Sequence, residues 1–333
     1  MRFIALVSGG KDSIYSILQA IRNGHELVAC LHLGAPAGDE NDGGEPEESY
    51  MYQTAASEAV KIVVEECLGV DLLLYPRQGK SVNTGLVYDN TTPKDEVEDL
   101  FLALEQATKR YDIDAVCSGA ILSTYQRVRI EHVCNRLGLA SLSYLWRLGP
   151  QKDLLRQMLD DGVEAILVKV ACPPGLVPHK HLNKSLRFLS DIGLLERLNQ
   201  LYQFHVCGEG GEYESFVVDS PLHKKKLVLD EVEILESDAG DGVGELRILS
   251  CHAEEKGEGD IPLLEEFLQQ QAERAQAEPS TDRAGESGKG ERKNTTTETL
   301  GATTRSTALP PRMSFATPRV YQGTGGLLHL GEI

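Results

Sequence analysis

The stretch LVSGGKDS at residues 6–13 joins an apolar run to a segment with helical periodicity. The overlapping run FIALV at 3–7 is continuously apolar, as expected for a strand that is buried on both faces. After the lysine, apolar side chains recur with helical spacing at Ile14, Ile17, Leu18 and Ile21. The stretch therefore predicts a strand, a glycine turn and a helix in direct succession.

The glycines of this turn indicate a binding site for an anion. Glycine lets the backbone approach a phosphate closely, and the free N–H groups of a helix start point toward it. Lys11 adds a positive charge, and Ser8 and Ser13 add hydroxyl donors. The turn is not a Walker A loop, because Ala5 replaces its first glycine and Asp12 replaces its Ser or Thr. The plainer alternative is a tight strand–helix turn with an incidental lysine.

Strand-like and helix-like segments alternate from this turn to about residue 235. Strands are expected at 27–33, 71–75, 114–118 and 165–170. Helices are expected at about 50–67, 97–104, 126–137 and 152–160. Such alternation predicts an α/β fold with a doubly wound parallel sheet.

The composition changes near the carboxyl end of the chain. Residues 254–312 are rich in Glu, Gln, Ser, Thr and Gly, and we expect a disordered linker with a short helix around 263–275. Residues 313–333 look strand-like again and are expected to open another domain, similar to the first strand of a YjgF-like domain. We therefore expect a folded domain at 1–235 that ends within 236–253.

The overall composition excludes several classes of protein. No apolar run approaches the roughly 20 residues that span a bilayer, and the amino terminus lacks the longer apolar region of a signal peptide. The net charge of −18 disfavours nonspecific binding of nucleic acid, which depends on Lys and Arg. The seven cysteines form no CxxC pair, so neither a zinc ribbon nor a disulfide framework is indicated. We expect a cytoplasmic protein that binds neither a membrane nor, directly, nucleic acid.

Two further glycine-containing segments are candidates for the same site. Gly119 and Ala120 follow the expected strand at 114–118, at the edge of the sheet where ligands bind, and their small size leaves room for a nucleotide. The turn CGEGGEYE at 207–214 carries three carboxylates, at Glu209, Glu212 and Glu214. Carboxylates this close together can hold Mg²⁺ on phosphate oxygens or bind an ammonium ion. An acidic turn in solvent is the plainer alternative.

These motifs resemble those of known enzymes. SGGKDS after a first strand resembles the pyrophosphate loop of the ATP pyrophosphatases. Together with that loop, three stretches resemble the diphthine–ammonia ligase family in order and spacing: SYMYQT at 49–54, GAILSTYQRVRIEHVCNRLGL at 119–139 and HVCGEGGEYESFVVDSPL at 205–222. The resemblance covers about residues 1–235.

The resemblance implies an adenine-nucleotide α-hydrolase-like fold and a specific reaction. The expected reaction is ATP-dependent amidation of diphthine, a modified histidine of translation elongation factor 2, with ammonium as the nitrogen source. ATP would transfer AMP to the diphthine carboxylate, and the products would be diphthamide, AMP and pyrophosphate. ATP is therefore the expected nucleotide, with Mg²⁺ expected beside it and no metal ligand assigned.

The resemblance also implies roles for individual residues. The residues expected to bind the nucleotide are Ser8, Gly9, Gly10, Lys11, Asp12, Ser13, Gly119 and Ala120. The expected catalytic residues are Lys11, Asp12 and Glu212. The residues expected to bind the other substrates are Tyr50, Gln53, Tyr125, Gln126, Arg127, Arg129, Glu131, Glu209, Gly210, Gly211 and Glu214.

Five histidines show no metal-ligand spacing and are expected to be structural or incidental: His32, His179, His181, His205 and His252.

Two other functions stay open at this point. One is a related pyrophosphate-loop enzyme that adenylates a tRNA base, although no CxxC pair or basic patch supports it. The other is a nucleotide sensor without catalysis, against which the Lys11–Asp12 pair and the acidic turn argue. Arg2 stands where a glutaminase with an amino-terminal nucleophile needs Cys, so no glutaminase is indicated.

Overall fold

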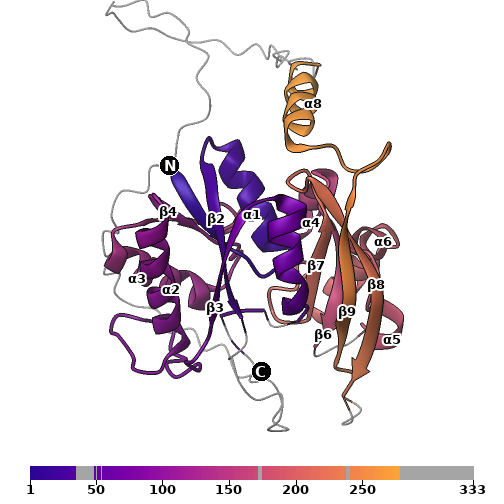
Figure 1. The fold of residues 1–333 in the computed structure, drawn as a ribbon. Coiled ribbons are helices and arrows are strands. Elements are labelled where there is room, and N and C mark those ends of the chain that lie inside the picture. The colour runs from indigo at the N-terminus through magenta and orange to yellow at the C-terminus, as the bar shows by residue number, and fades with distance from the viewer. Residues whose placement is uncertain (35–48, 50, 54, 172–174, 238–240, 278–333) are drawn as a thin grey trace, which may run out of the picture. The chain divides into compact units, whose positions relative to one another are not determined.

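The computed structural model describes residues 1–34, 49, 51–53, 55–171, 175–237 and 241–277. Within them, five parallel strands form one sheet in the order β3–β2–β1–β4–β5 (Figure 1). The strands are β1 (Arg2–Leu6), β2 (Glu26–Gly34), β3 (Asp71–Pro76), β4 (Ala115–Cys117) and β5 (Ala140–Leu142). The predicted α/β fold with a parallel sheet is confirmed, and β5 is a three-residue strand too short to show a pattern in the sequence.

Helices cover both faces of the parallel sheet, as a doubly wound fold requires. They are α1 (Lys11–Arg22), α2 (Glu96–Arg110), α3 (Thr124–Leu137) and α4 (Gln151–Asp160). Successive side chains of β1 point to opposite faces. Ile4 joins the apolar core under α2 and α3, whereas Phe3 and Ala5 join the core that includes α1 and α4 (Figure 1).

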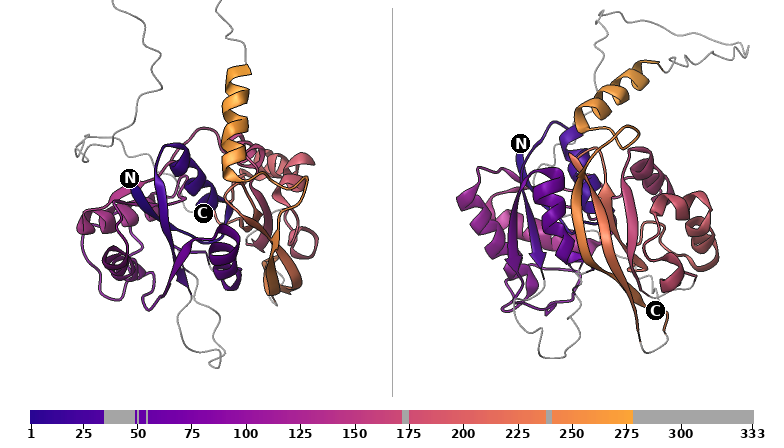
Figure 2. Two further views of the ribbon diagram at one scale, coloured as in Figure 1. Left: turned by 45° about the horizontal axis from the view of Figure 1, so that its top comes forward. Right: turned by 45° about the vertical axis from the view of Figure 1, so that its right-hand side comes forward.

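A second sheet of four strands lies beyond α1 and α4, in the order β7–β6–β9–β8. Its strands are β6 (Glu164–Val170), β7 (Tyr213–Asp219), β8 (Lys225–Glu236) and β9 (Gly244–Glu255). The short helices α5 (Pro178–His181), α6 (Leu186–Asp191) and α7 (Leu194–Tyr202), pink in Figure 2, cover its far face.

Placing the strand at 165–170 in the parallel sheet was wrong, because β6 pairs antiparallel with β7 and β9. The continuous apolar run of this strand indicates that both of its faces are buried, and such burial occurs in parallel and in antiparallel sheets.

The described part of the segment 50–67 does not form the single helix that we expected there. It contains a 3₁₀ turn, η1 (Ser57–Ala59), and a π-helical segment, η2 (Ile62–Leu68), after Ala56 with a φ of +58°. Val63 is fully buried, and η2 packs against β3, β8 and β9. Packing between the two sheets therefore overrides the regular helical spacing in this segment.

The fold continues into the segment expected to begin the linker at residue 254. Lys256 forms an ion pair of 2.7 Å with Asp219, and both side chains are about one-tenth exposed or less. The expected short helix is present as α8 (Leu264–Ala277), which buries Phe267 against the core. The expected strand at 313–333 lies outside the described residues. Among those that are described, no helix combines the length and apolar character needed to cross a membrane.

Lys256 is expected to stabilise the fold strongly. Its ammonium group also donates to the carbonyl oxygens of Ser220 and Ile261. Lys256→Met should lower the free energy of unfolding by about 3 kcal/mol, because it leaves the Asp219 carboxylate buried without its counter-charge. Urea denaturation measures this effect. Lys225→Met, which breaks an exposed pair with Glu255, is the matched control and should change stability little.

Candidate active site

The glycine turn after β1 is held by close contacts with β7. Gly9 has a φ of +83°, and a Cβ atom there would lie 2.3 Å from Cε2 of Phe216. The Val217 amide donates to the Gly9 carbonyl over 2.9 Å. Both the backbone conformation and the packing therefore require glycine at this position.

The helix start behind the turn has no cap from its own N-cap residue, although the Lys11 amide donates to Ser215 Oγ on β7 over 3.3 Å. Gly10 is the N-cap residue of α1 and has no side chain to accept hydrogen bonds from the first turn. Ser8 Oγ instead accepts from the Gly10 amide over 3.2 Å, and Ser13 Oγ donates to the Gly10 carbonyl over 2.9 Å. The two serines thus stabilise the turn, and the helix start keeps the dipole that favours a bound anion.

Lys11 is buried at this helix start, with 3% of its surface exposed. Its ammonium group donates to Asp12 Oδ2 over 2.9 Å and to the Cys207 carbonyl oxygen. Burial lowers the pKa of Lys11, but the neighbouring acidic groups, led by Asp12, raise it by more. Lys11 is therefore a fixed positive charge in a dry environment, where its field is strong.

Asp12 carries the other charge of the pair. Burial raises its pKa to about 6, against the opposing effect of Lys11, and the negative charge of Glu209 raises it further. Its Oδ2 accepts from Lys11, whereas the buried Oδ1 has no hydrogen-bond partner. An unpartnered carboxylate oxygen beside a second carboxylate fits Mg²⁺, which binds one or two carboxylates together with phosphate oxygens.

The end of β4 packs against the same helix start. A Cβ atom at Gly119 would lie 2.7 Å from the carbonyl carbon of Asp12, so the missing side chain allows this contact rather than leaving room for a nucleotide. Ala120 is buried beside it. Ser118, which we did not predict, has a buried hydroxyl without a hydrogen-bond partner. The sequence could have indicated Ser118, because it is the polar residue that ends the strand-like run DAVCS.

The three carboxylates of the turn at 207–214 do not converge on one point. Glu209 Oε1 accepts from the amides of Ile121, Leu122 and Ser123 at 2.8–3.1 Å, just before α3. Glu212 accepts from the amides of His205 and Gly210 at 2.7 and 2.9 Å. Glu214 lies 3.9 Å from Lys169. The described part of the chain contains no group of three or more His, Cys, Asp or Glu placed to hold a metal.

The expected three-carboxylate cluster is therefore not formed. Glu209 and Glu212 instead accept backbone N–H donors, which is a favourable role for a carboxylate. Glu209 joins the turn to the loop before α3, and Glu212 closes the turn itself. Gly210 and Gly211 are exposed at its tip.

The segment 51–53 lies between the glycine turn and the start of α3. The Gln53 amide donates to the Ser215 carbonyl over 3.1 Å, and its oxygen would meet a Cβ atom on Gly10 at 2.7 Å. Gln126 at the start of α3 donates to the Met51 carbonyl over 3.3 Å. Tyr50 lies outside the described residues.

The charged residues of α3 divide into an outer and an inner set. Arg127 pairs with Glu131 at 2.7 Å and lies 4.7 Å from the centre of the Trp146 ring. Arg129 is fully buried, where we expected a substrate contact or a surface ion pair. It lies over the Tyr125 ring and donates to backbone carbonyls, so it is not open to a ligand.

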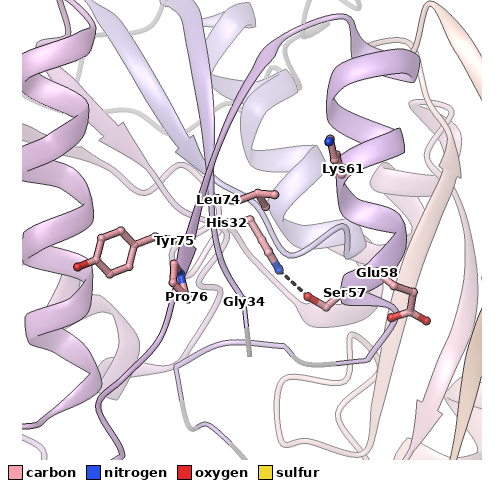
Figure 3. Close-up of a pocket in the computed structure, with 8 residues that line it drawn as sticks. All are labelled: His32, Gly34, Ser57, Glu58, Lys61, Leu74, Tyr75 and Pro76. Carbon is pink, nitrogen blue, oxygen red and sulfur yellow. Dashed lines mark hydrogen bonds between the residues drawn. The ribbon is translucent and has the colours of Figure 1, made fainter. Parts of the chain in front are cut away.

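A pocket of about 370 Å³ opens at the carboxyl ends of β2 and β3 (Figure 3). It is lined by His32, Gly34, Ser57, Glu58, Lys61, Leu74, Tyr75 and Pro76. His32 connects the pocket to the glycine turn, with Nδ1 2.8 Å from the Val7 carbonyl oxygen and Nε2 2.7 Å from Ser57 Oγ (Figure 3). We expected His32 to be structural or incidental, and both of its ring nitrogens have partners within the protein.

Comparison with known proteins identifies the family. The diphthamide synthase N-terminal domain family matches residues 1–141, and the diphthamide synthase C-terminal domain family matches residues 152–243. Diphthine–ammonia ligase from Bos taurus is 46% identical over 261 residues, which cover 77% of this chain and 94% of that protein. The chain belongs to the diphthine–ammonia ligase family.

More distant relatives within the diphthine–ammonia ligase family are longer. The enzyme from Saccharomyces cerevisiae is 37% identical over 257 residues, which cover 72% of this chain and 36% of that protein. Among solved structures, a predicted subunit of tRNA methyltransferase from Methanocaldococcus jannaschii matches 68% of this chain and 100% of that one at 19% identity. Its TM-score of 0.31 is too low to carry an argument.

The raised pKa of Asp12 predicts a pH-dependent stability in this member of the diphthine–ammonia ligase family. Because the folded-state pKa of about 6 exceeds the unfolded value of 3.8, ionised Asp12 destabilises the fold. This destabilisation is absent at pH values below the pKa of Asp12 in the unfolded chain. It reaches its full size at pH values above the pKa of Asp12 in the folded protein. The side chain is 27% exposed, which moderates the effect.

Asp12→Asn removes this titration. The stability of the variant relative to the parent should rise by about 1–2 kcal/mol between roughly pH 4 and pH 7. Denaturant unfolding of both proteins across this range measures the difference. A difference that does not change with pH would contradict the raised pKa.

Proposed function

We propose that this chain amidates diphthine on translation elongation factor 2, with ammonium as the nitrogen source and ATP as the activating substrate. Membership of the diphthine–ammonia ligase family makes it a ligase that forms C–N bonds. The observation that carries the proposal is the buried Lys11–Asp12 pair at a helix start whose N-cap residue is glycine. No observation favours a tRNA-adenylating enzyme or a noncatalytic nucleotide sensor.

The glycine turn and the residues around it suit the phosphates of ATP. Anions bind at helix starts, and the fixed charge of Lys11 would stabilise the negative charge that develops on departing pyrophosphate. The free Asp12 Oδ1 would take Mg²⁺ on the phosphate oxygens, and the Ser118 hydroxyl is a further donor. When bound, Mg²⁺ would neutralise phosphate charge.

The pocket beside His32 suits the nucleoside end of ATP. Its volume lies in the range typical of ligand pockets. Leu74 and Pro76 offer apolar surface to a flat base, and Ser57 offers a polar group. The hydrogen bond from His32 to the Val7 carbonyl joins the pocket to the residue just before the glycine turn. We infer that one ATP molecule would span both places.

The chemistry explains why ATP is cleaved between its α- and β-phosphates. A carboxylate repels nucleophiles, and its oxide is a poor leaving group, whereas a carboxyl–AMP anhydride has a good leaving group. Ammonium must lose a proton before its nitrogen can attack this anhydride. The neighbouring negative charges of Asp12 and Glu209 would attract an ammonium ion to this end of the glycine turn, where it would release its proton to solvent.

Oxygen transfer tests this reaction directly. The diphthine carboxylate is labelled with oxygen-18, and the purified protein is supplied with ATP and ammonium. One labelled oxygen should appear in AMP, because the attacking carboxylate oxygen leaves with the adenylyl group. ADP and phosphate as products, or unlabelled AMP, would rule out the adenylate.

Lys11→Met tests the loop. Pyrophosphate release should fall by about 100-fold or more, because the fixed positive charge is lost where pyrophosphate charge develops. Since Lys11 is buried, the variant will also be less stable, and activity must be measured well below its melting temperature. Lys226→Met removes an ion-paired lysine far along the chain, on β8, and should keep the parental rate. Equal rates for the two variants would argue against a role for the loop.

A further inference from the structure

The loop at 77–95, between β3 and α2, exposes an apolar tip. Val82, Leu86 and Val87 are 53%, 72% and 65% exposed. Most apolar side chains on a protein surface are scattered singly and need no explanation. Here three of them lie within six consecutive positions of one loop.

Buried charges hold the base of this loop. Arg77 and Glu96 form an ion pair of 3.0 Å, and their side chains are 5% and 0% exposed. The Ser81 hydroxyl donates to Glu96 over 2.6 Å. Asp95, which is 1% exposed, accepts from the Asn83 amide over 2.7 Å.

Arg129 holds the tip from the other side. Its guanidinium group, fully buried on α3, donates to the carbonyl oxygens of Asn83 and Gly85. The same group lies 5.2 Å from the centre of the buried Tyr88 ring. The backbone on both sides of the apolar tip is therefore fixed to α3 and to the start of α2.

This arrangement is costly to form. Removing a charged group from water costs several kcal/mol unless close partners compensate for it. The loop uses buried charges at Arg77, Glu96, Asp95 and Arg129, yet the side chains that it presents contribute nothing to the core. Rigid placement of an exposed apolar group is the property expected of a preorganised binding surface.

The tip is connected to the candidate active site through a short series of contacts. The Tyr125 hydroxyl at the start of α3 donates to the Asn83 carbonyl over 3.4 Å. The next residue, Gln126, contacts the Met51 carbonyl, and Gln53 contacts β7 beside the glycine turn. The loop follows β3 and the glycine turn follows β1, and these strands flank β2 and end at the same edge of the parallel sheet.

We propose that Val82, Leu86 and Val87 form the docking surface for the folded protein that carries the carboxylate to be amidated. The proposal rests on the proposed function, which requires a protein substrate to reach this edge of the sheet. A protruding aliphatic tip offers no donor to a phosphate and cannot enclose a small molecule. It can insert into an apolar depression on a protein, as the central residues of protein interfaces do.

The test is the double variant Leu86→Ser with Val87→Ser. The KM for the protein substrate should rise about tenfold or more, with kcat at saturation, ATP affinity and melting temperature close to the parental values. The matched control is Phe188→Ser on α6 with Ile192→Ser directly after it, which removes two exposed apolar side chains from the helices that cover the antiparallel sheet. An unchanged KM, or an equal rise in the control, would overturn the proposal.

Direct binding separates this proposal from the proposed function. Binding of the parent and both variants to the diphthine-bearing protein is measured by biolayer interferometry without ATP. Weaker binding by the Leu86/Val87 variant alone supports docking even if the parent forms no amide, a result that would contradict only the proposed function. Sedimentation equilibrium gives the oligomeric state. A parental dimer that this variant dissociates would assign the tip to a second copy of the chain and overturn the proposal.

Discussion

The buried ammonium group of Lys11 is the interaction on which the site depends. Lys11 belongs to α1 after the first parallel strand, and it donates to the Cys207 carbonyl in the turn before β7. A cation in a dry environment needs close acceptors, so the glycine turn and the turn at 207–214 must keep their relative positions. One lysine thereby ties the parallel sheet to the antiparallel sheet.

The carboxylates near this lysine are of two kinds. Glu209 and Glu212 accept backbone N–H donors and so define the shape of the loop before α3 and of the 207–214 turn. Asp12 keeps one buried oxygen without a partner and has a pKa of about 6. The hydrogen-bond capacity of Glu209 and Glu212 is used to hold the backbone in place, whereas Asp12 can still bind a cation.

A charged side chain farther from the glycine turn also holds the backbone of a loop in place. Arg129 was predicted to bind a substrate, but its buried guanidinium group donates to backbone carbonyls of Asn83 and Gly85 in the loop at 77–95 and of Tyr125 on α3. Buried charges therefore position loops on both sides of the parallel sheet's carboxyl edge.

Local sequence alone determined the glycine turn, its strand and helix, and the alternation that makes the fold α/β, because these depend on neighbouring residues and on residue spacing. Tertiary structure decided where long-range partners lie. Glu209 meets Ile121 across 88 positions, and Lys256 meets Asp219 across the antiparallel sheet. The antiparallel pairing of β6 was likewise hidden, since an apolar strand shows that it is buried and not what it pairs with. Hydrogen-bond partners and desolvation are properties of the folded chain, so only the fold could separate structural charges from available ones.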